Sequence, residues 1–272
     1  MKSKLSMLPY AIWMIIFIVV PTALVFIFAF TDLSGNFTFS NIINVGNYSS
    51  VFLRSIWLGG VATVICLLIG YPFSYIISKV SVSKQGILLM LIMLPMWMNF
   101  LLRTYAWMTL LENNGLINKF LMMLGFKPID MINTQGAVVI GMIYNFLPYM
   151  ILPIYSVMSK IDKRIIEAAK DLGAGKRKVF LKIILPLSMP GVISGITMVF
   201  VPAVSTFIIS KMLGGGANLL IGDLIDMQFL GSSYNPNLGS AISLVLMILI
   251  LICLGIMNQF DDLGDENRGM MI

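Results

Sequence analysis

Long apolar runs divide the sequence, and several of them reach the roughly 20 residues that a helix needs to cross a bilayer. The 272-residue chain is 58% hydrophobic and only 11% charged, whereas about a quarter of the residues in a soluble domain are charged. These properties predict an all-α integral membrane protein with six transmembrane helices in a single domain, 1–272. The predicted spans are 8–30, 54–78, 86–111, 135–158, 183–212 and 238–257, with a polar loop at 159–182.

Lysine and arginine are distributed unevenly between these spans. The N-terminus and the loops at 79–84 and 160–182 are basic, whereas the intervening loops carry few positive charges. Because positively charged loops remain in the cytoplasm, we expect a multi-pass protein with both termini and the 159–182 loop on the cytoplasmic side. The same rule explains the net charge of +6 without a nucleic-acid partner.

The sequence lacks the groups that most enzymes use. It contains no histidine, which excludes imidazole metal sites and histidine-based acid–base chemistry. Its Gly175-Lys176 pair is followed by Arg177 rather than Ser or Thr, and Lys170 stands where a phosphate-binding loop requires glycine. We therefore predict no catalytic site, no metal and no cofactor in this chain, and no ATPase site of its own. Energy for any active process would come from a partner.

The basic loop has the pattern of a short amphipathic helix. Ser159 to Asp162 has capping-box-like spacing, which predicts a helix start, and Gly173 to Gly175 predicts its end. Two alanines on this helix would allow a close approach by another protein. From the residues alone, a surface helix lying on anionic lipid is an equally acceptable interpretation. The apolar residues that share one helical face are Ile161, Ile165, Ala168 and Leu172.

Three elements of this loop together resemble the EAA loop of bacterial ABC-importer permeases. They are Glu167-Ala168-Ala169, Gly173 six residues after the glutamate, and Ile183-x-Leu185-Pro186. The resemblance implies a type I importer permease (MetI-like) fold in the bacterial cytoplasmic membrane. It also implies that the loop is a coupling helix, which docks in a cleft of a separate ATPase subunit that binds ATP. The implied coupling residues are Glu167, Ala168, Ala169, Leu172 and Gly173.

Further motifs are similar to those of spermidine/putrescine permeases of the same family. They are Leu94–Asn99, Leu102–Trp107, Val201–Ala203, Leu213–Gly215 and Leu220–Asp223 continuing to Phe229. The position of Asp223 is often Asn in those permeases. The resemblance implies polyamine import, with two copies of an ATPase, a second permease of the PotC type and an extracytoplasmic polyamine-binding protein as partners. The alternatives are another small solute (an opine, a sulfate-like solute or another cation), a channel, or a membrane-embedded enzyme.

A polyamine pathway needs aromatic faces for cation–π contact and a few carboxylates. We expect candidates at Trp97, Tyr105, Trp107, Asp223 and Asp226. The aromatic residues could equally form an interfacial belt or pack within the protein, and the carboxylates could be solvated. Arg103 is unexpected in a cation pathway. We expect it near the external surface, where it pairs with Glu112 or extends toward water.

Overall fold

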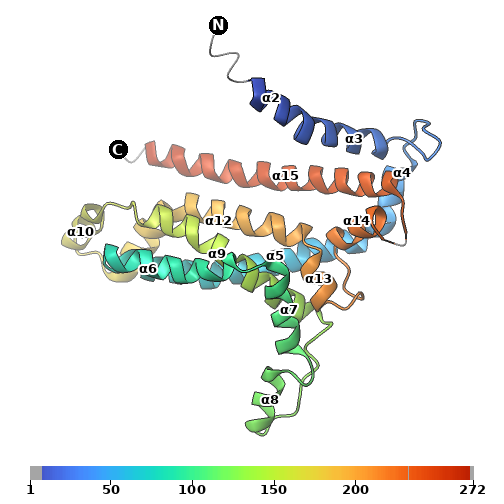
Figure 1. Ribbon diagram of the computed structural model, residues 1–272. Coiled ribbons are helices and arrows are strands. Elements are labelled where there is room, and N and C mark those ends of the chain that lie inside the picture. The colour runs from blue at the N-terminus through green and yellow to red at the C-terminus, as the bar shows by residue number, and fades with distance from the viewer. Residues whose placement is uncertain (1–7, 232, 270–272) are drawn as a thin grey trace.

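The computed structural model describes residues 8–231 and 233–269, and nearly all of these residues lie in helices or in the turns between them (Figure 1). Outside the helices, the described part of the chain has one isolated β-bridge, between Thr31 and Phe37. Five helices are long and apolar enough to cross a membrane, and a bent pair of helices brings the total to six. The six predicted spans therefore correspond to an all-helical membrane bundle.

The centre of the bundle consists of α5 (Ser49–Lys79), α9 (Gln135–Met158) and α12 (Leu185–Ser205). Gly191 lets α12 approach α9 closely because glycine has no side chain: a Cβ atom at this position would lie 2.8 Å from the Pro153 carbonyl oxygen. Hydroxyl groups join the helices as well. The Ser74 Oγ of α5 donates to the Ile151 oxygen of α9 at 3.0 Å, and this bond satisfies a polar group that the bilayer could not solvate.

A second layer packs on one side of this centre. It is formed by the first span, α2 (Leu8–Met14) with a π-helical segment Ile15–Val19 and α3 (Val20–Ala29), together with α15 (Pro236–Gly269). Figure 1 shows α3 running alongside α15. The apolar contacts of this layer also involve two short helices, α4 (Ser40–Val45) and α14 (Ile221–Phe229).

The third span is not the continuous helix that we predicted over 86–111. It consists of α6 (Val82–Met93), a 3₁₀ turn at Leu94–Trp97 and α7 (Phe100–Leu111), which turn by 88° at the break. Pro95 lacks an N–H, Met98 is extended, and the Asn99 side chain caps α7 by accepting the Leu101 N–H at 2.8 Å. As a result α7 and the following α8 (Leu116–Met123) project away from the bundle (Figure 1).

The fifth span also differs from the predicted range 183–212. Its helical path begins at α11 (Lys176–Val179), continues through a π-helical segment at Phe180–Ile184 and ends with α12 at Ser205. The extended Thr206 separates α12 from α13 (Ile208–Leu213). The start of α14 packs against this break, since a Cβ on Gly222 would lie only 2.7 Å from the Thr206 oxygen. The helices of the second and sixth spans are longer than the predicted ranges 54–78 and 238–257. In the structure α5 begins at Ser49, and α15 continues to Gly269.

Candidate functional site: the α10 segment and its pocket

A short polar helix, α10 (Lys163–Asp171), connects α9 to the fifth span. It lies at one end of the bundle, and α13 and α14 lie at the opposite end (Figure 1). The helix starts at Lys163 because the Asp162 carboxylate accepts the Arg164 N–H at 2.9 Å. The predicted start at Ser159 is therefore wrong: residues 159–161 form a turn, and Asp162 is the N-cap.

The C-terminal end of α10 is a Schellman turn. Gly173 has a φ of +80°, the left-handed conformation that glycine adopts without steric cost. Its N–H donates to the Lys170 oxygen at 2.8 Å, and the Ala174 N–H donates to the Ala169 oxygen at 3.0 Å. These bonds satisfy two carbonyl groups that would otherwise lack partners. The chain then turns directly into α11, so α10 is held between two membrane helices by short connections at 159–162 and 172–175.

One face of α10 points away from the rest of the protein. It carries Ile165, Ala168 and Leu172, and Leu172 is 89% exposed. An exposed leucine on a polar helix has no packing role within this chain. Such an apolar face, with a small residue at its centre, is suited to contact with another protein.

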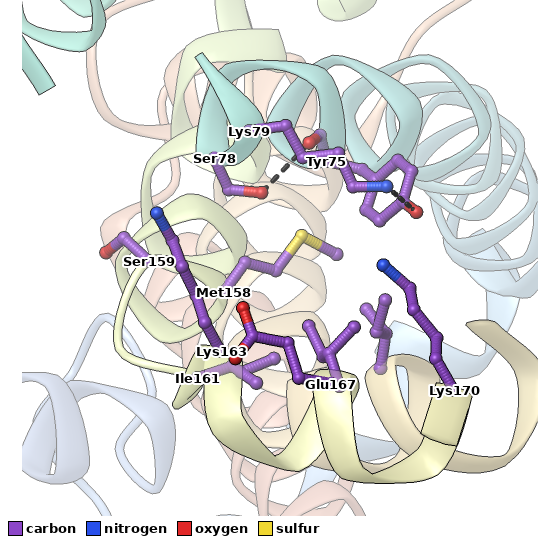
Figure 2. Close-up of a pocket in the computed structure, with 11 residues that line it drawn as sticks. Tyr75, Ser78, Lys79, Met158, Ser159, Ile161, Lys163, Glu167 and Lys170 are labelled. Atoms are coloured by element: carbon purple, nitrogen blue, oxygen red, sulfur yellow. Dashed lines mark hydrogen bonds between the residues drawn. The ribbon is translucent and has the colours of Figure 1, made fainter. Parts of the chain in front are cut away.

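The opposite face of α10 lines a pocket of about 220 Å³ against the ends of α5 and α9. Figure 2 shows Glu167 and Lys170 reaching from α10 into this pocket, toward residues of α5 and α9. Three lysines and one glutamate therefore surround a single cavity. The lining residues are Tyr75, Ser78, Lys79, Met158, Ser159, Ile161, Lys163, Ile166, Glu167, Lys170 and Ile184.

The structure separates the coupling residues that the sequence grouped together. Ala168 and Leu172 lie on the outward face, whereas Glu167 lies on the pocket face and Ala169 is half-buried between them. Gly173 shapes the end of the helix. Sequence reasoning did not anticipate the pocket. The helical spacing of Lys163, Glu167 and Lys170 gave a signal for a shared face, but nothing in the sequence placed Lys79 opposite them.

The aromatic pathway candidates have different environments. Trp97, at the break of the third span, is 73% exposed, and Tyr105 is exposed as well. Trp107 is half-buried, with its ring centre 5.3 Å from that of Tyr144 in an edge-to-face contact. Trp107 is therefore placed by packing, while Trp97 and Tyr105 present free aromatic surface. None of the three lines the pocket in Figure 2.

The two carboxylate candidates lie on α14, at the end of the bundle opposite α10. Asp223 is buried, and its Oδ2 accepts the Leu220 N–H at 2.8 Å, so that it caps α14. Burial raises the pKa of the Asp223 carboxyl above its ordinary value, although its hydrogen bonds and nearby Lys211 act in the opposite direction. Asp226 pairs with Lys211 at 3.0 Å. The alternative that both carboxylates are simply solvated is therefore wrong for Asp223.

Arg103 does not extend toward water as we expected. The residue is only 8% exposed, and its guanidinium lies 5.7 Å from the ring centre of Phe100. Its Nε and Nη1 atoms are buried without a hydrogen-bond partner, and it makes no ion pair with Glu112 within the described residues. The helix that carries Arg103, α7, follows the 88° bend and packs against α9 and α13.

The chain thus combines five helices of membrane-spanning length, a bent pair that would make a sixth span, and a polar helix between α9 and the α11–α12 path. The chain belongs to the family described as binding-protein-dependent transport system inner membrane component, whose profile matches residues 3–261. It is thus the transmembrane permease component of an ABC importer and not the ATPase, and it works with ATPase and binding-protein partners. It is a multi-pass protein of the inner membrane.

Several permeases are similar in sequence to this chain over most of its length. The spermidine/putrescine transport system permease protein PotB of Haemophilus influenzae is 40% identical over 88% of this chain and 86% of its own. PotB of Escherichia coli is 37% identical over 88% of this chain and 90% of its own. The inner membrane ABC transporter permease protein YdcU of Escherichia coli is 27% identical over 80% and 73% of the two chains.

Solved structures share the fold at low sequence identity. A chain of a bacterial ABC transporter involved in the import of alginate superposes with a TM-score of 0.82, covering 95% of this chain and 94% of that one at 15% identity. A chain of the MetNI methionine ABC transporter in an inward-facing conformation gives a TM-score of 0.59, with coverages of 79% and 95% at 14% identity. These likenesses confirm the MetI-like permease fold.

Proposed function

We propose that this permease imports polyamines, with spermidine and putrescine as its substrates. The observation that carries the proposal is the 40% identity to a spermidine/putrescine permease over 88% of the chain. The exposed aromatic rings of Trp97 and Tyr105 support a cationic cargo, because ammonium groups are attracted to aromatic faces. Trp107 would act less directly, through its packing against Tyr144. Asp223 would do so through its cap on α14, and Asp226 through its ion pair with Lys211.

We further propose the composition of the complete transporter. A second permease of the PotC type would complete the membrane pathway, two ATPase copies would bind at the α10 end, and a polyamine-binding protein would dock at the α14 end. The uneven distribution of lysine and arginine supports a cytoplasmic α10 and cytoplasmic termini. The C-terminal end of α15 lies at the same end of the bundle as α10, which agrees with that orientation (Figure 1).

In this proposal the outward face of α10 is the ATPase contact. ATP binding and hydrolysis in the partner would move α10, and the bundle would alternate between outward and inward access. Ala168 and Leu172 would touch the ATPase directly. Glu167 would act from the pocket face, and Gly173 would fix the end of the helix. The exposure of Leu172 at the tip of α10 supports this division.

The function is tested by uptake into vesicles that contain the complete transporter and its binding protein. We expect ATP-dependent accumulation of labelled spermidine and putrescine, each competing with the other, because both present ammonium groups on methylene chains. An opine or sulfate should not compete. Accumulation of an opine or a sulfate-like solute instead, with no polyamine uptake, would contradict the assignment. Polyamine flux that persists when ATP hydrolysis is blocked would favour the channel alternative.

Trp97→Ala should lower spermidine uptake at subsaturating concentration by about two- to fivefold, as expected for the loss of one exposed cation–π contact. The complex should still assemble, since the side chain is 73% exposed. The matched control is Trp57→Ala, which removes a tryptophan that is 68% exposed on α5. If both variants transport equally well, Trp97 does not belong to the polyamine route.

A further inference from the structure

We propose that the pocket between α10 and the ends of α5 and α9 binds a phosphate-bearing anion. Its lining contains the ammonium groups of Lys79, Lys163 and Lys170 and one carboxylate, that of Glu167, which gives a net charge of 3 − 1 = +2. Two helices contribute the cations, α5 and α10, so the positive charge converges from opposite walls. This inference concerns a ligand other than the cargo and does not depend on the polyamine assignment.

Within the described residues, no ion pair neutralises the positive charges of the pocket. The ion pair between Lys211 and Asp226 is the one found in the described residues, and it lies at the other end of the bundle. Glu167 stands four residues after Lys163 and three before Lys170, a spacing that puts all three on one face, yet it forms no ion pair with either. Like charges around one cavity repel each other, and a bound anion would relieve that repulsion.

The α5 wall of the pocket positions a hydrogen-bond donor beside these charges. The Lys79 ammonium donates to the Tyr75 hydroxyl oxygen and lies 3.9 Å from the centre of the Tyr75 ring. Because the hydroxyl acts as an acceptor in this bond, its own proton remains available for an oxygen of the ligand. Figure 2 shows Lys170 extending toward this pair from α10. Lysine ammonium groups next to a hydroxyl donor form a suitable environment for phosphate oxygens.

The size of the pocket fits a phosphate group. A volume of about 220 Å³ is many times the roughly 10–15 Å³ that one water molecule needs on the same measure, so a phosphate group can enter. The apolar part of the lining, Met158, Ile166 and Ile184, could contact the carbon atoms attached to a phosphate. The phosphate could come from an anionic phospholipid of the adjacent leaflet or from a soluble phosphate compound, and the same side chains would bind either.

Neither the helix ends nor a cationic ligand accounts for all three lysines of the pocket. Helix C-terminal ends attract cations, and α5 and α9 both end at the pocket. That effect accounts for Lys79 but not for Lys163 and Lys170, which lie on α10 itself. A cationic ligand such as a polyamine would need an excess of carboxylates, and the pocket has the opposite charge.

The test uses the intact complex with its partner subunits in membranes of phosphatidylcholine. In one arm phosphatidylglycerol is titrated in and the retained lipid is counted by native mass spectrometry. In the other arm inorganic phosphate is titrated and its binding is measured by calorimetry. We expect at least one anion to bind, and Lys163→Gln combined with Lys170→Gln to weaken that binding about 25-fold, roughly fivefold for each lysine. The matched control is Lys176→Gln with Arg177→Gln, an exposed basic pair of α11 outside the pocket.

Binding of phosphatidylglycerol alone would identify a lipid site, and binding of inorganic phosphate alone would identify a soluble ligand. Either result supports the proposal if the pocket variant loses that binding and the control variant retains it. Equal binding by wild type and the pocket variant, or equal losses in the pocket and control variants, would overturn it. So would the absence of binding in both arms. Tyr75→Phe provides a second variant that keeps every charge, and it should weaken binding about fivefold through the lost donor.

Discussion

Gly191→Val is expected to destabilise the bundle by about 3 kcal/mol. A Cβ atom at this position would lie 2.8 Å from the Pro153 oxygen and 3.0 Å from the Ile154 Cα, both of which belong to the backbone of α9. Neither atom can rotate away, so α9 and α12 would have to separate. The measurement is the thermal unfolding midpoint of the purified protein in detergent, which should fall by several degrees.

Gly60→Val is the control for this experiment. Gly60 also lies inside a long membrane helix, α5, but a Cβ atom there would meet nothing within 4 Å. The two variants therefore share the same substitution and the same helical backbone and differ only in the space available. Equal unfolding midpoints for the two variants would show that α9 and α12 do not approach as closely at Gly191 as the structure indicates.

Leu172→Asp should weaken the association of the permease with its ATPase by about 2 kcal/mol or more, roughly thirtyfold, as for a central interface residue. The leucine is 89% exposed at the tip of α10, so the substitution should leave the fold of the isolated chain unchanged. In the complex, the new carboxylate would be buried against the ATPase without a partner. The measurement is the fraction of ATPase that co-purifies with the permease, followed by the dissociation rate of the complex.

The control is Leu230→Asp, which places the same charge on a leucine that is 84% exposed next to α14. This position lies at the opposite end of the bundle, where the proposal puts no ATPase. We expect Leu230→Asp to co-purify normally. If Leu172→Asp retains the ATPase as well as this control does, the outward face of α10 is not the contact surface.

The sequence was sufficient to predict the class of fold, because each span had to be long and apolar. It did not reveal the breaks in the third and fifth spans. Pro148 and Pro153 lie inside the continuous helix α9, whereas Pro95 precedes a break. Proline alone is therefore ambiguous in a membrane helix, where neighbouring groups can satisfy the freed carbonyl. What distinguishes the third span is Asn99, whose side chain caps a new helix.

The candidate site was predictable in position but not in its orientation. The spacing of Ile165, Ala168 and Leu172 correctly indicated a shared apolar face, and the glycine indicated the helix end. Ile161, which we placed on the same face, instead lies in the turn before α10 and lines the pocket. Which face would turn outward depended on contacts with α5, more than 80 residues earlier in the sequence. Asp223 shows the same limit, since it is buried at the start of α14, whose neighbouring Gly222 packs against the broken end of α12.

The short connections on either side of α10 determine how stiff the segment is. Residues 159–162 and 172–175 provide little slack, because even a fully extended chain covers only about 3.5 Å per residue. Both connections lead into helices, α9 and the α11–α12 path, that touch along their backbones. A displacement of α10 larger than this slack would move both helices at the same time. The segment therefore transmits movement to the bundle as a stiff connection rather than as a flexible linker. If either connection were lengthened with flexible residues, these residues would absorb the displacement of α10, and the membrane helices would not move with it.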